Sequence, residues 1–157
     1  MVIDLIRQQN ELIAHECRFV LWPRQWANYE NRHALDWRIR RLAEAERPDI
    51  PNEPGVYTLL IQPDIAAHPA CSYLMYVGKA ERLRRRFRDY LVREKREKGR
   101  PKIFRGLNLY SSYLWFCFTL APVEILGDVE DTLLNAYVPP WNDQLPAEIR
   151  GTVGAFR

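Results

Sequence analysis

The sequence predicts an α+β fold: a small three-stranded antiparallel sheet flanked by helices, with an N-terminal helical arm. Apolar runs at 56–62, 72–79 and 112–120 have the composition of strands, and only a loop separates the first two. Segments with a period near that of a helix precede, separate and follow these runs. This order of elements is typical of an antiparallel sheet with helices packed against it.

The first fifty residues form the predicted arm. Residues 2–17 place apolar side chains on one helical face, namely Ile3, Ile6, Leu12 and Ile13. Pro23 ends this pattern, and a second helix is predicted at 33–46 from the spacing of Leu35, Ile39 and Leu42. Three prolines within 47–55 mark a boundary. We therefore expect an arm at 1–50, a main domain at 51–145 and a C-terminal tail at 146–157.

The main domain is expected to begin with a hairpin. Its strands lie at 56–62 and 72–79, with an extended loop at 62–72. A helix follows at 81–98, where Leu83, Phe87 and Leu91 form an apolar stripe, and "GRP" at 99–101 ends it. A short helix at 101–107, the third strand at 112–120 and a helix at 123–137 complete the order.

Charge is unevenly distributed along the 157 residues. The net charge is only +3, yet the segment from Lys79 to Arg105 holds 13 Lys/Arg against 4 Asp/Glu. Such a segment indicates either a surface that binds a polyanion or an ordinary solvated helix, and charge alone leaves both open.

Cysteines and apolar runs indicate the class of protein. Cys17, Cys71 and Cys117 lie far apart and lack the ligand spacing of a zinc site. Polar residues begin too early for a signal peptide, and no apolar run reaches membrane-spanning length. We expect a cytoplasmic protein with no membrane partner.

Arg86 occupies an unusual position in the predicted helix at 81–98. On a helical wheel Arg86 and Tyr90 flank the apolar stripe and so face the seam between helix and sheet. A guanidinium in such a seam loses water and needs an anionic partner, either a phosphate or a structural carboxylate.

Glu130 has a similar position in the last predicted helix. Apolar residues share its helical face, whereas Asp131 falls off that face. An acid there is costly unless it is paired or bound to a metal ion. A single carboxylate suits one Mg²⁺ ion, which keeps several of its waters.

Five short motifs follow one another along these elements. They are Gly55-Val56-Tyr57, Tyr76-Val77-Gly78, "ERLRRRFRDY" with Arg86 and Tyr90, Glu130, and a closing Pro139 and Asn142. In this order the chain resembles the GIY-YIG nuclease family over about residues 54–142, with valine in place of isoleucine in both name motifs. The distance from Tyr57 to Tyr76 is longer than in the family's usual hairpin.

The resemblance implies a divalent-metal-dependent DNA endonuclease that hydrolyses phosphodiester bonds. Glu130 is then expected to bind one Mg²⁺ or Mn²⁺, Arg86 to neutralise charge on the phosphate, and Tyr57 to act as the general base. Tyr76 and Tyr90 would position water and phosphate, and Lys79 would assist Tyr57. The expected structural residues are Gly55, Gly78 and Asn142.

Outward-facing basic residues are expected to contact duplex DNA through its backbone, without reading sequence. They are Arg84, Arg85, Arg88, Arg93, Lys95 and Arg96.

The biological role is open from sequence. The expected role is restriction or phage defence, since the arm and the long hairpin loop accompany a compact domain. The alternatives are a structure-specific repair or recombination nuclease and a catalytically silent nucleic-acid-binding module. The arm could also mediate a homodimer or recruit a partner protein.

Overall fold

A four-stranded antiparallel sheet forms the centre of the computed structural model, which describes residues 2–63, 68, 71–92, 95 and 97–155. The strands are β1 (Arg38–Arg41), β2 (Gly55–Ile61), β3 (Tyr73–Ala80) and β4 (Leu114–Leu120), in the spatial order β1-β4-β2-β3. The predicted α+β class, the hairpin and its antiparallel pairing are confirmed. The predicted strand number is wrong, because the sheet has four strands rather than three.

The extra strand replaces the helix predicted at 33–46, and that prediction is wrong. Residues 38–41 pair with 115–118 of β4, and a 3-10 helix, η1 (Glu44–Asp49), follows. Without β1, the backbone groups along this edge of β4 would be unpaired. Pairing with a strand far along the chain therefore outweighs the local helical spacing.

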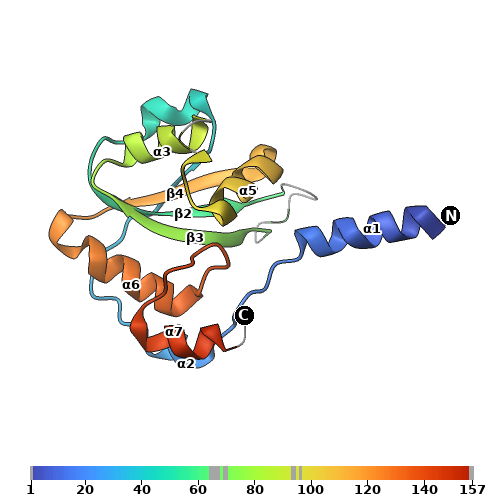
Figure 1. Ribbon diagram of the computed structural model, residues 1–157. Helices are drawn as coiled ribbons and strands as arrows, with labels where there is room; N and C mark the ends of the chain where they lie inside the picture. The colour runs from blue at the N-terminus through green and yellow to red at the C-terminus, as the bar shows by residue number, and fades with distance from the viewer. Residues whose placement is uncertain (1, 64–67, 69–70, 93–94, 96, 156–157) are drawn as a thin grey trace.

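Helices cover both faces of the sheet (Figure 1). On one face lie α3 (Leu83–Leu91) and α5 (Pro101–Leu109), which is followed by η2 (Ser111–Tyr113). On the other lie α6 (Leu126–Tyr137), preceded by η3 (Val123–Ile125), and α7 (Ala147–Gly154). The expected tail at 146–157 thus contains a helix, whose Ile149 and Val153 are buried.

The predicted helix at 81–98 is shorter in the structure, since α3 ends at Leu91. Residues 93–94 and 96 lie outside the described residues, as do 64–67 and 69–70 of the expected loop at 62–72.

The side chains of β2 point alternately to the two faces of the sheet and so contribute to two parts of the core. Tyr57 and Leu59 pack toward Phe87 on the α3 side, whereas Val56 packs toward Val129 on the α6 side. Successive side chains of a strand point to opposite faces, so one strand serves both layers.

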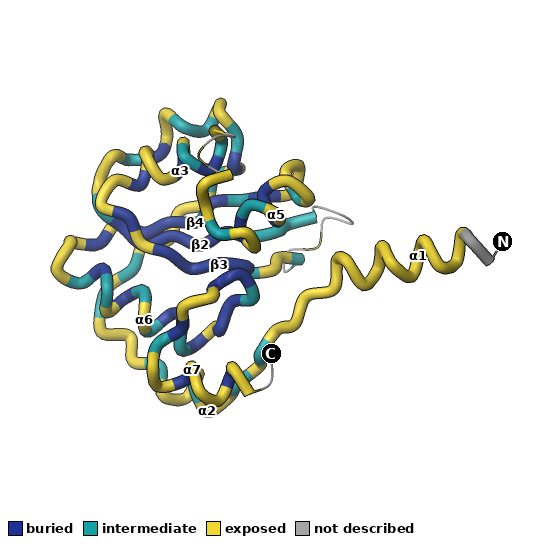
Figure 2. Tube along the Cα trace, in the orientation of Figure 1, coloured by how far each residue is buried: buried dark blue, intermediate teal, exposed yellow. Residues whose placement is uncertain are grey.

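The arm lies partly on the body and partly away from it. Trp26, in α2 (Pro23–Ala27), donates a hydrogen bond from Nε1 to the carbonyl oxygen of Ala136 at 2.9 Å, which ties α2 to α6. By contrast, α1 (Val2–His15) projects from the body, and its tube is drawn as exposed in Figure 2. Among the described helices, none is both long and apolar enough to cross a membrane.

Candidate active site

Three tyrosines from three different elements meet on the α3 side of the sheet. Tyr57 comes from β2, Tyr76 from β3 and Tyr90 from α3. The ring centroids of Tyr57 lie 6.1 Å from Tyr76 and 5.9 Å from Tyr90, and the hydroxyls of Tyr57 and Tyr90 are 2.6 Å apart. The fold thus brings together the three tyrosines that the sequence motifs contain.

Tyr57 is the most enclosed of the three. Its side chain is 1% exposed, and its ring stacks on Phe116 at a centroid distance of 4.9 Å. Gly78 lies opposite Tyr57 in the sheet, and a Cβ added there would approach the Tyr57 hydroxyl oxygen to 2.7 Å. Gly78 is therefore required for the ring of Tyr57 to pass over the β3 backbone. A Cβ at Gly55 would similarly come within 2.3 Å of the Thr119 carbonyl oxygen.

Glu130 reaches the same site from α6 and is paired with Lys79 of β3. Glu130 Oε2 lies 2.9 Å from Lys79 Nζ, and the glutamate side chain is 17% exposed. This ion pair accounts for an acid on the inner face of α6. It also raises the pKa of Lys79, chiefly through the hydrogen bond to Glu130, so Lys79 stays charged. Asp131, one residue further, is exposed as expected.

Arg86 faces the tyrosines from α3. Arg86 is exposed in part. The pKa of its guanidinium is raised above the ordinary value, chiefly by Tyr57, and this effect outweighs burial, which lowers it. The guanidinium thus stays charged at the mouth of the site and meets the phenols on one side and solvent on the other.

Burial raises the pKa of all three phenols. The effect is large for Tyr57 and Tyr90, whose hydroxyls bond to each other. For Tyr76, burial again raises the pKa, while the nearby charges of Arg100 and Arg86 lower it and Glu130 raises it. Arg86 and Arg100 also lower the pKa of Tyr90, so these two cations favour ionisation of both Tyr76 and Tyr90, while burial keeps both pKa values above the ordinary value.

These groups line one cavity of about 270 Å³. Its walls include the six predicted catalytic residues, which are Tyr57, Tyr76, Lys79, Arg86, Tyr90 and Glu130. Lys95 of the predicted DNA-contacting set also lines it.

The sequence did not single out two further residues of this cavity, Asp89 and Arg100. Asp89 follows Arg86 by three residues and so shares its side of α3, which is a spacing signal visible in the sequence. Arg100 precedes α5 in a connection, where no periodicity indicates the direction of a side chain. Arg100 also donates to Gln144 Oε1 at 3.3 Å.

The cavity fits a divalent cation of the Mg²⁺ type. Glu130 offers a carboxylate, and Mg²⁺ is commonly held through one or two carboxylates while it keeps several waters. Asp89 offers another oxygen: its Oδ1 is buried without a hydrogen-bond partner among the described residues, and Arg88 Nη2 is 3.7 Å away. The described residues contain no group of three or more His, Cys, Asp or Glu side chains placed to hold a metal, so the fit concerns these two carboxylates.

Asn142 holds the outer edge of β3 in place. It is 2% exposed; its Oδ1 accepts from the Val77 amide at 2.9 Å and its Nδ2 donates to the Val77 carbonyl at 2.8 Å. The amide of Trp141 also donates to the Met75 carbonyl at 2.9 Å. The turn at 141–142 thus bonds to the outer edge of β3, beside Tyr76 and close to Lys79.

The predicted DNA-contacting set divides in the structure. Arg85 and Arg88 are exposed on α3. Arg84 instead donates to the carbonyls of Ile50 at 2.6 Å and Pro48 at 3.3 Å, which anchors η1 to α3. Arg93 and Arg96 lie outside the described residues.

Comparison with known proteins gives structural matches only. No family model and no curated protein matches the sequence. The chain is similar to solved structures of the GIY-YIG N-terminal endonuclease domain of UvrC from Thermotoga maritima. One point mutant bound to its catalytic divalent cation has 24% sequence identity and a TM-score of 0.43, over 64% of this chain and 93% of that chain.

Two further structures of that domain give similar values. Another point mutant has 25% identity and a TM-score of 0.43, over 65% of this chain and 99% of that chain. The magnesium-bound form has 26% identity and a TM-score of 0.42, over 62% and 92%. At such TM-scores the chemistry of this chain has to be inferred from its own residues.

Proposed function

We propose that the chain is a divalent-metal-dependent DNA endonuclease that hydrolyses phosphodiester bonds. The observation that carries this proposal is the cavity in which phenols, guanidinium groups and a carboxylate from β2, β3, α3 and α6 meet. Phosphodiester hydrolysis needs an activated water, stabilisation of charge on the phosphoryl oxygens and help for the leaving oxygen. Each need has a suitable group in the cavity.

Glu130, with Asp89 as a second oxygen donor, would hold the ion. When bound, a divalent ion supplies Lewis-acid polarisation of a phosphoryl oxygen. Lys79 Nζ lies 2.9 Å from the Glu130 carboxylate, which would bind the ion, and this contact keeps Glu130 oriented toward the cavity. Lys79 also lines the cavity, where its ammonium would add positive charge near a bound phosphate.

Arg86 and Arg100 would neutralise the charge that grows on the phosphate. Both line the cavity, and both act electrostatically on Tyr76. A guanidinium suits this task because it stays charged and can donate two parallel hydrogen bonds to phosphate oxygens.

We assign the general base to Tyr76 in place of Tyr57. The Tyr57 hydroxyl is enclosed and bonded to Tyr90, and burial raises its pKa strongly. Tyr76 is less enclosed than Tyr57, and the charges of Arg100 and Arg86 oppose the effect of burial on its pKa, so its Oη would take the proton of the attacking water. Tyr57 and Tyr90 would then fix the position of the Tyr76 ring and of the phosphate.

Plasmid nicking tests the proposal. Glu130→Gln keeps the shape of the side chain and is expected to reduce nicking in Mg²⁺ or Mn²⁺ by about a hundredfold or more. Asp131→Asn removes a neighbouring exposed charge on the same helix and should leave the rate unchanged. Nicking by Glu130→Gln at the rate of the unmodified protein, or wild-type protein that binds DNA without cutting it, would overturn the proposal; the second result would favour a binding module.

The finer role we propose is restriction or phage defence in the cytoplasm. Linear duplex, supercoiled plasmid, flap, branched junction, single strand and RNA should be compared as substrates. Cutting of unbranched duplex at defined positions is the expected result. A strong preference for flaps or junctions would indicate repair or recombination instead.

A further inference from the structure

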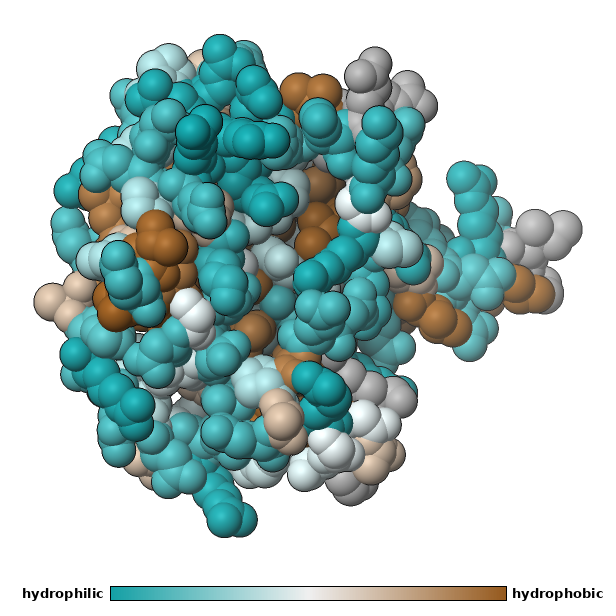
Figure 3. All heavy atoms as spheres, turned by 60° about the vertical axis from the view of Figure 1, so that its left-hand side comes forward, coloured by the Kyte–Doolittle hydropathy of each residue, from teal (hydrophilic) through white to brown (hydrophobic). Residues whose placement is uncertain are grey.

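Helix α1 exposes apolar side chains that the rest of the chain does not cover. Every residue from 4 to 19 is exposed, and Leu5, Ile6, Leu12 and Ile13 have 63%, 54%, 74% and 58% of their surface in solvent. Hydrophobic residues are visible on the projecting arm at the right of Figure 3. An isolated helix of this length is marginal in water, so α1 gains stability from a surface that covers its apolar face.

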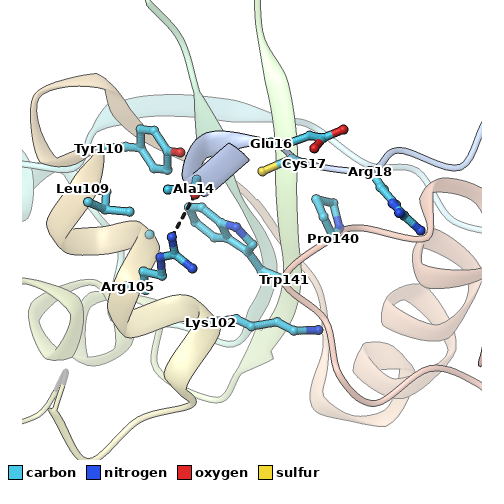
Figure 4. A pocket seen from close by; sticks show the side chains of 11 residues that line it. Ala14, Glu16, Cys17, Arg18, Lys102, Arg105, Leu109, Tyr110, Pro140 and Trp141 are labelled. Carbon is cyan, nitrogen blue, oxygen red and sulfur yellow. Dashed lines mark hydrogen bonds between the residues drawn. The ribbon is translucent and has the colours of Figure 1, made fainter. Parts of the chain in front are cut away.

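The root of α1 is fixed to the body. Arg105 Nη2 donates to the carbonyl of Ala14 at 2.8 Å (Figure 4). His15 Nδ1 lies 2.8 Å from the Tyr110 hydroxyl. A basic side chain at the last carbonyls is a common way to end a helix. These bonds to α5 set where the helix leaves the body, so its apolar face is presented from a defined position.

Four exposed apolar residues of α1 are arranged symmetrically about Gln9. Ile6 and Leu12 lie three residues before and after it, and Leu5 and Ile13 lie four residues before and after it. On a helical wheel all five fall within about 120°. Gln9 is therefore the centre of a palindromic stripe. Such a stripe matches itself residue by residue when two copies run antiparallel about a two-fold axis through Gln9.

The distribution of charge on α1 is compatible with the same partner. Asp4, Arg7 and Glu11 lie on the opposite side of the helix from Gln9, so two copies meet without burying a charge. The residues beside the stripe, Gln8 and Asn10, carry neutral amides.

We propose that α1 pairs with α1 of a second copy of this chain, antiparallel, with the two-fold axis at Gln9. Leu5 then meets Ile13 of the other copy, Ile6 meets its Leu12, and the two Gln9 amides meet at the axis. A single polar residue in such a seam specifies register at some cost in stability. The two roots lie roughly 18 Å apart along the helix axis, so the bodies extend from opposite ends of the pair.

The contact between the two α1 helices is small, so the dimer is weak. A helix of 14 residues is about 21 Å long, and two such helices bury less than the roughly 1,200 Å² of a standard stable interface. The dimer is therefore concentration-dependent. If the proposed function holds, binding of both bodies to one duplex raises their effective concentration and favours cutting of both strands.

Sedimentation of the full chain, without DNA or metal, tests the pairing independently of the nuclease. Mass should rise from monomer to dimer with concentration. Ile6→Asp should remain monomeric, Arg7→Ala on the outer face should dimerise normally, and Gln9→Leu should dimerise more tightly. A monomer at all concentrations, or dimerisation of Ile6→Asp at the normal level, would overturn the proposal.

Disulfide cross-linking tests the direction of the helices. In a Cys17→Ser background, Gln9→Cys should cross-link to itself, and Leu5→Cys should cross-link to Ile13→Cys but not to itself. Cross-linking of Leu5→Cys to itself would show a parallel pair and overturn the antiparallel arrangement. Glu130→Gln should dimerise normally, so a failed nuclease proposal and a failed dimer proposal give different results.

Discussion

Asn142 provides a stringent test of how the fold supports the site. Asn142→Ala removes the partners of both the Val77 amide and the Val77 carbonyl, in a place where the side chain is 2% exposed. Each buried group left unsatisfied costs about 1–3 kcal/mol, so the free energy of unfolding should fall by about 2–6 kcal/mol. That is a large part of the roughly 5–15 kcal/mol of a typical domain. The melting temperature should fall by at least about 4 °C.

Asn142→Asp separates the two hydrogen bonds. The carboxylate still accepts from the Val77 amide but faces the Val77 carbonyl without a proton to donate. Only the protonated acid restores the second bond, so its folded-state pKa is raised above about 3.9, the value of the unfolded chain. A raised folded pKa contributes stability that is complete below the unfolded pKa and is lost as pH rises through the folded pKa. The variant should therefore lose stability relative to the wild type on going from about pH 5 to about pH 8.

Urea unfolding followed by tryptophan fluorescence at both pH values measures these effects. Asn108→Asp is the matched control, since the Asn108 side chain is exposed and donates to the Phe104 carbonyl of its own helix. A loss below about 1 kcal/mol for Asn142→Ala, or a pH dependence of Asn142→Asp equal to that of the control, would refute the account of the β3 edge.

Three further predictions concern chemistry, binding and packing. The cleavage rate should rise with pH in the alkaline range, because burial raises the pKa of the proposed base, Tyr76. Tyr76→Phe should abolish this rise. A rise that is retained in Tyr76→Phe and lost in Tyr57→Phe would show that Tyr57 is the base. Arg85→Ala should lower the salt dependence of DNA binding by about one unit of slope, whereas Arg84→Ala should mainly reduce thermal stability, since its guanidinium bonds to two carbonyls. Equal salt slopes for wild type and Arg85→Ala would contradict a phosphate contact. Gly78→Ala should lower both the melting temperature and nicking, because the new Cβ meets the Tyr57 ring; normal values in both assays would show that the ring can move.

Local pattern sufficed for much of the fold. The apolar runs of β2 and β3 predicted the hairpin, and the spacing of Leu83 and Phe87 predicted α3, because strand and helix periods are properties of short segments. β1 was missed because an exposed edge strand of four residues has little apolar signal and depends on its pairing with β4.

The candidate site shows the same division. Arg86 and Glu130 stood out in the sequence because a charge beside apolar helical neighbours needs a partner. The pairing of Glu130 with Lys79 and the place of Arg100 in the cavity depended on how β3, α3 and α6 lie side by side, whereas the spacing of Asp89 from Arg86 was already present in the sequence. How readily each tyrosine ionises also depends on how deeply its hydroxyl is buried, and the sequence alone does not give that burial.

By itself the sequence determined which side chains are available: the tyrosines of the two strands, the arginines of α3, the acid Glu130 among the apolar residues of α6, and the symmetrical apolar stripe of α1. Those follow from residue type and periodicity, which act over a few residues. Only the tertiary structure decided that Glu130 meets Lys79 at 2.9 Å, that Asn142 closes the edge of β3, and that Tyr57 is enclosed while Tyr76 lies beside two cations. The reason is physical: distances, burial and electrostatic fields arise between segments far apart in the chain, and they exist only after those segments pack.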